Sequence, residues 1–513
     1  MPTLNWIGKE AVVNHDKEVP FRLLKKVKSY SVGDNSQNLI IKGDNLEGLK
    51  ALMPYYIGKV KCIYIDPPYN TGNENWVYND KVNSPKIKKW LGKVVGGESQ
   101  DLCRHDKWLC MMYPRLKLLR DLLSDDGVIF VSIDDNEHCN LKQIFEEIFG
   151  EDNFVTNIVW QKKYTQSNDA KYFSNTHDFI MCFAKDKSKI KIGLMKRTKE
   201  QDDRYKNPDN DPHGLWMTQP LHAKSGNTHN FEHKFNNGVS WRPPKNTFPR
   251  YNYETLRKAE EEGKIWFGAN GTAVPRLKKY LKEMKEGTIP KTIWLYHEVG
   301  SNDDGRKELK NLFGEASFQT PKPVKLLKQI FRLTTSCSDI ILDSFAGSGT
   351  TGHAVLDLNK EDNGNRKFIL IEMEDDIAKQ ITAERIKRAI EKYDYKDGFE
   401  YCELDKPLFD ENGQIEETCD FNQFATYIYF TETQTNIDKK QIDKNFIGES
   451  GKIEYYLIYK EKMKNVFDKE FLKKIKRTKN KKIIYADFCM VDEDDLKKCN
   501  IQFKQIPYEV KVY

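Results

Sequence analysis

Short apolar runs that end in acidic or glycine-rich turns limit most strongly what this chain can fold into. Each run is rich in β-branched residues and is followed by a segment with helical periodicity. Strands that are apolar on both faces are typical of parallel sheets covered by helices on both sides. The pattern therefore predicts an α/β fold. Its clearest strands are expected at Asn38–Lys42, Val60–Ile65, Gly127–Ile133, Asp339–Leu342 and Lys367–Ile371.

Two further runs and two helix starts complete the expected sheet domain. Asn157–Gln161 and Asp178–Ala184 are close in sequence and are expected to form an antiparallel edge pair. Asp44 or Asn45 can cap the helix that follows the first strand, and a long amphipathic helix is expected to begin at Asp375. Strands and helices thus alternate on both sides of a long central segment.

The composition changes in that central segment. Asparagine, glycine, proline, histidine, lysine and tryptophan become frequent there, and the periodicity is poor. A chain of 513 residues is too long for one ordinary core, so several domains are expected. We predict a sheet domain split into residues 1–189 and 316–400, an inserted domain at 190–315, and a small C-terminal α+β domain at 401–513.

Composition excludes classes of protein rather than assigning a function. Hydrophobic residues make up 38% and charged residues 31%, which is typical of globular proteins. No run approaches the roughly 20 apolar residues of a membrane helix. The N-terminus lacks an apolar signal core, so a cytoplasmic location is expected. The ten scattered cysteines are expected to be reduced thiols, and the net charge of +6 is weak support for a polyanionic partner.

The strand at Val60–Ile65 leads directly into Asp66-Pro67-Pro68-Tyr69. At the carboxyl end of a parallel strand this tetrapeptide would lie in the ligand crevice of the sheet. The carboxylate of Asp66 and the carbonyl of Pro67 could hold the hydrogens of an exocyclic amine, while Tyr69 stacks on a base drawn out of a duplex. The alternative interpretation is an Asp-Pro-Pro turn that merely ends a strand.

A glycine-rich turn follows the strand that begins at Asp339. Gly347, Gly349 and Gly352 form G-x-G-x-x-G between a strand and a helix, and Glu372 ends the next strand. Glycines let a ligand approach the backbone, and a carboxylate at that spacing can hold ribose hydroxyls. Alone, this pattern predicts a nicotinamide dinucleotide as readily as an adenosyl group, and a tight strand–helix turn is the alternative without a ligand.

The two motifs together resemble the β-type amino-methyltransferases, in which DPPY precedes a target-recognition region and FxGxG comes last. The blocks that carry the resemblance cover most of residues 38–185 and 316–390. They are IKGDNLEGLKAL, IYIDPPYNTGNENWVYND, GVIFVSIDDNE, FQTPKPVKLLKQI, LDSFAGSGTTGHAVLDLN and FILIE. The resemblance implies a seven-stranded methyltransferase sheet with helices on both faces, circularly permuted so that its first two strands come last.

The resemblance also implies the chemistry: transfer of a methyl group from S-adenosyl-L-methionine to the N6 amine of adenine in double-stranded DNA, with base flipping and direct in-line transfer. Asp66, Pro67, Pro68 and Tyr69 match the catalytic motif. An Asp in its first position is typical of adenine-N6 enzymes, whereas Ser marks cytosine-N4 enzymes. The cofactor-binding residues that it implies are Asp44, Thr320, Lys322, Asp343, Phe345, Ala346, Gly347, Ser348, Gly349 and Glu372.

The inserted domain is expected to read the DNA sequence. Its mixture of basic, amide and aromatic side chains suits phosphates and base edges, and Arg242, Lys245 and Arg250 are candidate contacts. His229 and His233 belong to an H-x-x-E-H pattern, but the surrounding residues are poor helix formers, so no metal site is predicted.

The opening LNWIGKE and the closing IQFKQIPYEVKV resemble modification subunits of type III restriction–modification systems. Those subunits are usually longer. The resemblance implies a homodimer and a possible restriction (helicase–nuclease) partner. Two other classes stay open: a catalytically silent DNA-specificity subunit and a nicotinamide-dependent oxidoreductase. The intact DPPY and FxGxG motifs disfavour the first, and DPPY has no use in the second.

Overall fold

A computed structural model describes residues 3–33, 36–71, 89, 92–94, 103–168, 170–226, 231–284, 287–315, 318–409, 415–416, 419–438, 442–460 and 464–506. The chain divides into two compact units. The main unit comprises Met1–Ile192 together with Lys291–Tyr513, and the smaller unit is Gly193–Pro290. The domain boundaries that we predict at 189, 315 and 400 stay a prediction.

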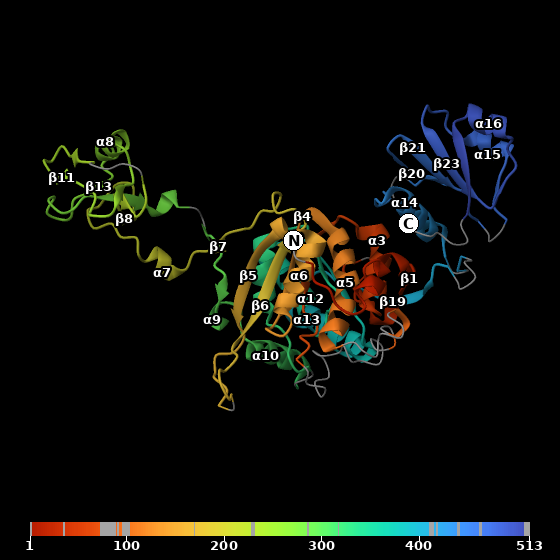
Figure 1. The fold of residues 1–513 in the computed structure, drawn as a ribbon, viewed down its shortest axis with the longest axis horizontal. Helices are drawn as coiled ribbons and strands as arrows, with labels where there is room; N and C mark the ends of the chain where they lie inside the picture. The colour runs from red at the N-terminus through yellow and green to blue at the C-terminus, as the bar shows by residue number, and fades with distance from the viewer. Residues whose placement is uncertain are drawn as a thin grey trace. The chain divides into compact units, whose positions relative to one another are not determined.

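The main unit is organised around one mixed sheet, which has ten strands within the described residues (Figure 1). Across the sheet the order is β1-β19-β2-β18-β17-β3-β4-β6-β5-β16. The strands are β1 Arg22–Lys26, β2 Leu39–Lys42, β3 Val60–Ile65, β4 Leu123–Ile133, β5 Phe154–Gln161, β6 His177–Ala184, β16 Ile293–Trp294, β17 Ile340–Asp343, β18 Lys367–Glu372 and β19 Glu400–Pro407.

The five strands predicted first are the parallel centre of this sheet. β2, β18, β17, β3 and β4 lie side by side and all run in the same direction. β6 is antiparallel to both β4 and β5. These seven strands confirm the predicted α/β methyltransferase sheet, and its permutation is visible because β17 and β18 come late in the chain yet lie at its centre.

Three more strands extend the sheet beyond the predicted seven. β16 pairs with β5, so the antiparallel pair predicted at the edge is covered by one further short strand. At the other end β19 pairs parallel to β2, and β1 pairs antiparallel to β19. The edge strand β1 carries lysines at its exposed positions, which suits the edge of a sheet.

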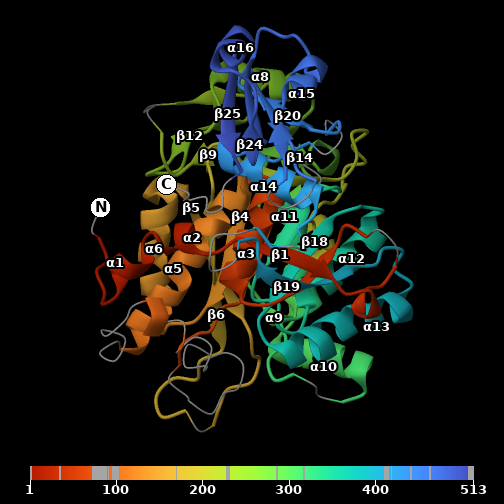
Figure 2. The same ribbon diagram turned by 90° about the vertical axis from the view of Figure 1, so that its right-hand side faces the viewer.

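Helices cover both faces of the sheet, as Figure 2 shows. On one face α3, α5 and α6 pack on one another and on the strands through a continuous apolar core. On the other face α11, α12 and α13 pack together, and α10 lies against α13. Their bounds are α3 Asn45–Tyr56, α5 Arg104–Leu122, α6 His138–Phe149, α10 Asn302–Phe313, α11 Val324–Thr334, α12 Thr350–Asp362 and α13 Glu384–Tyr393.

The two predicted helix starts are observed. Asp44 is the N-cap of α3, and its Oδ1 accepts hydrogen bonds from the amides of Leu46 and Glu47 at 2.9 and 3.2 Å. The amphipathic run begins as a helix at Asp375 and continues through α13. Its segment Ile377–Ala383 is π-helical, a form that is frequent at functional sites.

The C-terminal part of the main unit forms a second, smaller sheet with the order β20-β21-β23-β25. The helix α14 Phe421–Thr433 shares an apolar cluster with this sheet. The strands are β20 Phe446–Ser450, β21 Ile453–Leu457, β23 Lys481–Ala486 and β25 Ile501–Gln505. Helix and sheet together have the α+β character predicted for this region.

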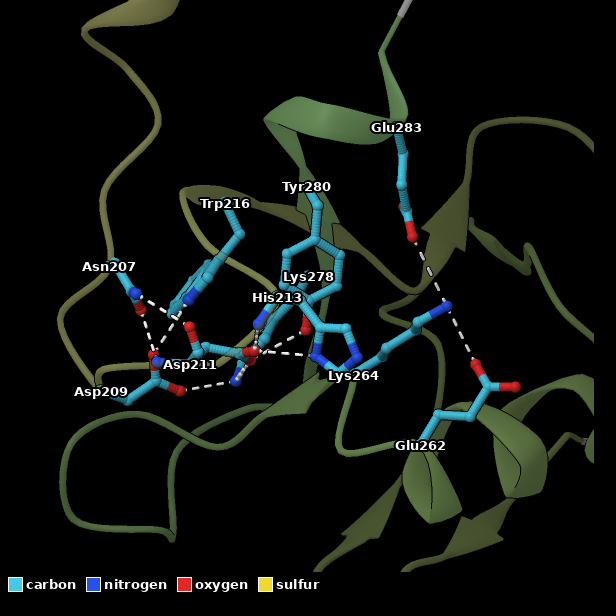
Figure 3. Close-up of polar contacts among 10 residues, drawn as sticks. All are labelled: Asn207, Asp209, Asp211, His213, Trp216, Glu262, Lys264, Lys278, Tyr280 and Glu283. Carbon is cyan, nitrogen blue, oxygen red and sulfur yellow. Dashed lines mark hydrogen bonds and ion pairs between the residues drawn. The ribbon is translucent and has the colours of Figure 1, made fainter.

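The smaller unit has its own core and a buried polar network. Its three-stranded sheet of β13 Ile265–Trp266, β14 Arg276–Tyr280 and β8 Trp216–Pro220 packs beside α8 Tyr253–Glu261. Figure 3 shows the network. The buried ammonium of Lys278 contacts Asp209 and Asp211 at 2.5 Å each, and Tyr280 donates to Asp211 at 2.8 Å. These bonds fix the segment before β8 on β14.

Gly305 gives a test of how tightly α10 packs against the segment that carries Lys322. A Cβ at this position would lie 2.2 Å from the carbonyl oxygen of Pro321. Gly305→Ala is therefore expected to lower the free energy of unfolding by about 1–3 kcal/mol, measured by denaturant titration. Lys307→Ala, an exposed site on the same helix, is the control. Equal stability of the two variants would contradict the close contact.

Candidate active site

The candidate site lies where the parallel strands end. Asp66 follows β3, Asp343 ends β17, and Glu372 ends β18. Asp44 follows β2 after one glycine. Because β2, β18, β17 and β3 are parallel neighbours, these four carboxylates share one edge of the sheet. The structure thus brings together the acids of the two motifs, which are far apart in the sequence.

The backbone of the DPPY motif is held by a hydrogen bond from α5. The indole of Trp108, which is fully buried, donates to the carbonyl oxygen of Pro68 at 2.7 Å. The next residue, Asn70, has a positive φ of 57°, and its amide donates to the buried carboxylate of Glu137. These two contacts hold the backbone on the C-terminal side of the motif. Neither Trp108 nor Glu137 was predicted as a site residue: Trp108 lies outside the blocks that carry the resemblance, and Glu137 ends the block GVIFVSIDDNE, to which no site role was assigned.

Asp66 forms an ion pair with Lys322, so the motif of one half of the chain contacts the TPKP segment of the other. The ammonium of Lys322 also lies 5.4 Å from the ring centroid of Tyr69, within cation–π range. Both Lys322 and Tyr69 are 6% exposed. The second carboxylate oxygen, Oδ1 of Asp66, is buried and accepts no hydrogen bond from the described residues. A buried acceptor of this kind is suited to a ligand's donor.

A second buried acid lies behind Tyr69. Asp178, at the start of β6, accepts a hydrogen bond from the Tyr69 hydroxyl at 3.5 Å and pairs with Lys162 at 2.5 Å. Burial raises the pKa of Asp178 to about 6. Neither Asp178 nor Lys162 was predicted as a site residue. The sequence does contain a sign of Asp178, because it is an acid at the start of an otherwise apolar strand. Its position beside Tyr69 follows only from the order of the strands in the sheet.

The glycine-rich turn is a compact loop at the N-terminus of α12. Gly347 and Gly349 have φ values of 50° and 74°, a region that favours glycine. The amide of Gly347 donates to Glu372 at 2.9 Å, so the predicted ribose-binding acid here holds the loop itself. Phe345 and Thr351 both donate to Asp343, and burial raises the pKa of that carboxyl to about 7.

Arg385 fastens this loop from α13 and was missed by the sequence interpretation. Its guanidinium is fully buried and donates to the hydroxyls of Ser348 at 3.0 Å and Thr350 at 2.7 Å. Burial lowers its pKa to about 10. Thr350 in turn donates to the carbonyl of Lys322 at 3.2 Å. In the sequence Arg385 belongs to an amphipathic charged run, where nothing distinguishes it from a solvated arginine.

The other predicted residues take varied positions. Besides capping α3, Asp44 lies 3.3 Å from the buried guanidinium of Arg115. Ala346 is buried in the loop, and Thr320 is half-buried in the segment before α11. In the smaller unit the three predicted DNA contacts are exposed, and Arg242 pairs with Glu232 at 2.5 Å. These three are Arg242, Lys245 and Arg250.

The described residues hold no cluster of three or more histidine, cysteine or acidic side chains that could bind a metal ion. His229 of the H-x-x-E-H pattern lies outside these residues, and His233 lies in the short strand β10 His233–Lys234. None of the described helices has the length and apolar character needed to cross a membrane.

The fold and site define a DNA methylase, and comparison with known families agrees. The profile of the DNA methylase family (N6_N4_Mtase) matches residues 60–383, which contain both motifs. The chain belongs to this family and, within it, is related to the modification subunits of type III restriction–modification enzymes. The oxidoreductase alternative is thereby excluded. The family covers both N6 and N4 amino groups, so membership leaves the target base open.

Two relatives and one solved structure are similar to this chain. The StyLTI Mod subunit of Salmonella typhimurium is 38% identical over 68% of this chain and 54% of its own length. The EcoP15I Mod subunit of Escherichia coli is 31% identical over 84% and 75%. Among solved structures, the cytosine-N4-specific PvuII DNA methyltransferase is 13% identical over 70% and 92%, with a TM-score of 0.37. The fold assignment rests on the strand order, not on that likeness.

Asp343 gives a test of the electrostatics of this edge. Because its pKa in the folded protein is about 7, well above that of an unfolded chain, folding favours the protonated carboxyl. Its contribution to stability is complete below about pH 4 and is lost as the pH rises through 7. Asp343→Asn keeps a donor and an acceptor but cannot ionise.

The free energy of unfolding of the variant should therefore fall less between about pH 5 and pH 8 than that of the parent protein, measured by denaturant titration without ligands. Asp376→Asn, at an exposed acid, is the control and should follow the parent. Parallel pH profiles for all three proteins would show that Asp343 is ionised throughout.

Proposed function

We propose that this chain is a site-specific methyltransferase that modifies the N6 amine of adenine in double-stranded DNA, with S-adenosyl-L-methionine as the methyl donor. The observation that carries the proposal is the acid at the start of the motif. Asp66 lies at the end of a central strand with one buried oxygen that accepts no hydrogen bond from the described residues. Resemblance to adenine-N6 enzymes, which have Asp at this position, supports the same choice of base.

The residues present fit such a cofactor. Gly347 and Gly349 keep side chains away from the loop, and Glu372 ends the adjacent strand where ribose hydroxyls are bound in this kind of sheet. The hydroxyl of Ser344, beside the loop, is buried and accepts or donates no hydrogen bond within the described part of the chain. When bound, S-adenosyl-L-methionine supplies an electrophilic methyl group. Thr320 and Lys322 are proposed to lie near its carboxylate.

The catalytic motif then acts on the amine of a base turned out of the duplex. The amine lone pair is delocalised into the purine ring, which makes it a weak nucleophile. Asp66 and the carbonyl of Pro67 would accept its two hydrogens and so localise the lone pair, an effect that is strongest in the transition state. Pro68 holds the turn through its bond to Trp108. Tyr69 offers an aromatic face to the base.

We further propose that the smaller unit reads the DNA sequence, with Arg242, Lys245 and Arg250 exposed for contact with phosphates or base edges. Pairing with a restriction subunit is proposed because three relatives are Mod subunits of type III restriction–modification enzymes. A homodimer and a cytoplasmic location are proposed on the resemblance of the sequence alone. A catalytically silent specificity subunit is the second candidate function, and the intact motif at Asp66 argues against it.

The product identifies the target base. DNA from a host that expresses the chain, digested to nucleosides and analysed by mass spectrometry, should contain N6-methyladenine that is missing from a host carrying an Asp66→Ala variant. N4-methylcytosine in its place would overturn the assignment of adenine while leaving a DNA methylase. Absence of both modified bases would favour the silent specificity subunit.

Asp66 and Tyr69 should fail in different ways. Asp66→Ala removes the acceptor and is expected to abolish turnover in single-turnover assays while changing cofactor affinity little. Because the change also leaves the buried Lys322 without its partner, Asp66→Asn provides a matched neutral variant, with the same expected loss. Tyr69→Ala should cost roughly 1–3 kcal/mol through lost stacking, and Tyr69→Trp should retain more activity.

Asp135→Asn is the control, since this acid is exposed beside the end of β4. It should methylate at the rate of the parent protein. Near-parental methylation by both Asp66 variants would show that the carboxylate has no role in activating the amine. The chain would then be a DNA methylase with a different mechanism.

A further inference from the structure

The loop between β5 and β6 extends from the same sheet edge as the catalytic motif. Gln161, at the end of β5, pairs with His177 at the start of β6, and Phe179 pairs with Ile133 at the carboxyl end of β4. The loop of residues 162–176 therefore begins and ends at the edge where Asp66 follows β3. Figure 1 shows it, in yellow-orange, projecting beyond the ends of β5 and β6.

Several aromatic side chains of this loop are far more exposed than aromatic residues that pack in a core. Phe173 is 95% exposed and Tyr172 is 81% exposed, side by side in the chain. Tyr164 is 53% exposed. Single exposed apolar residues are common, but adjacent large rings held clear of any core mark a surface that is covered by a partner. Tyr172 and Phe173 bury too little of their surface to add much to a hydrophobic core.

The charges of the loop indicate the chemistry of that partner. Its sequence contains three lysines, Lys162, Lys163 and Lys171, and one acid, Asp169. Lys163 and Lys171 are exposed, and the ammonium of Lys171 lies 5.3 Å from the ring centroid of Tyr172. Aromatic rings for stacking, flanked by cations for phosphates, are a combination that fits nucleic acid.

The base of the loop is fixed next to the catalytic motif. The amides of Lys162 and Lys163 both donate to the carbonyl of Thr176, and the ammonium of Lys162 pairs with Asp178, which accepts from the Tyr69 hydroxyl. Tyr164 packs on Tyr296 with ring centroids 5.5 Å apart. The base of the loop that carries the exposed rings is thus connected to Tyr69 through Lys162 and Asp178.

We propose that Tyr172 and Phe173 enter the DNA duplex at the target site and occupy the space that the target base leaves, while Lys163 and Lys171 contact the flanking phosphates. The inference rests on the proposed function, because it needs a base that is turned out toward Tyr69. Apolar side chains are known to enter base stacks where a duplex is unstacked. Here they would favour the open duplex and so raise the share of bound DNA with an extruded base.

The test compares a paired duplex with one already weakened at the target. The site is first located by methylation sequencing, and synthetic duplexes then carry the target adenine opposite thymine or opposite a mismatched adenine. The double variant Tyr172→Ala/Phe173→Ala should lose roughly 10- to 100-fold in kcat/KM on the paired duplex. On the mismatched duplex most of the loss should disappear, because a mismatched base costs less to extrude.

Three further variants sharpen the result. Phe488→Ala removes a ring that is 51% exposed in the C-terminal part of the chain and should match the parent on both duplexes. Lys163→Ala/Lys171→Ala should flatten the dependence of DNA affinity on salt by about two units of slope. An aromatic double variant, Tyr172→Trp/Phe173→Trp, should keep most of the parental activity on the paired duplex.

Equal activity of the alanine variant and the parent on paired DNA would overturn the proposal. A loss of the same size on both duplexes would also overturn it, because it would indicate a structural role or contact with a second copy of the chain, which sedimentation would detect. A parent protein that methylates neither duplex would instead refute the proposed function and is recognised by the inactivity of all the variants.

Discussion

The parallel pairing of β17 with β3 is the constraint on which the rest of the molecule depends. It joins the two halves of the sheet across the segment that contains the smaller unit. Because both strands run in the same direction, Asp343 and Asp66 follow neighbouring strand ends. The same pairing brings the TPKP segment to the motif, where Lys322 meets Asp66. Neither half contains both motifs.

This arrangement places several carboxylates close together at one edge of the sheet, so their negative charge has to be offset by cations. Burial is the largest cause of the raised pKa of Asp343, and the charges of Asp66 and Glu372 add to it. The buried Lys322 and the partly buried Lys162 offset part of that charge. Burying ions costs free energy, so such groups persist where function requires them. An edge of this charge is suited to a cationic ligand such as a sulfonium.

The sequence predicts the centre of the sheet and the contiguous motifs, because both leave local patterns. The five parallel strands are apolar on both faces, and the glycine turn has fixed spacing. The outer strands have no such pattern. β1 is RLLKK and β19 is EYCELDKP, half-exposed and rich in charge, while β16 has only two residues. Asp178 and Arg385 could not be predicted from the sequence either. Each is a single polar residue whose contacts depend on strand order and helix packing.

The antiparallel direction of β6 has a consequence for the site that a wholly parallel sheet would lack. In a parallel sheet the connection that follows each helix enters the next strand at the edge opposite the ligand crevice. β5 runs parallel to β4 and ends at the carboxyl edge, and β6 starts there because it runs the other way. The hairpin therefore supplies a loop directly at the site without a helix in between. Asp178 is the first result of this reversal, since it starts β6 beside Tyr69. The exposed Tyr172 and Phe173 are the second, since the loop that carries them begins and ends at the edge where Asp66 follows β3.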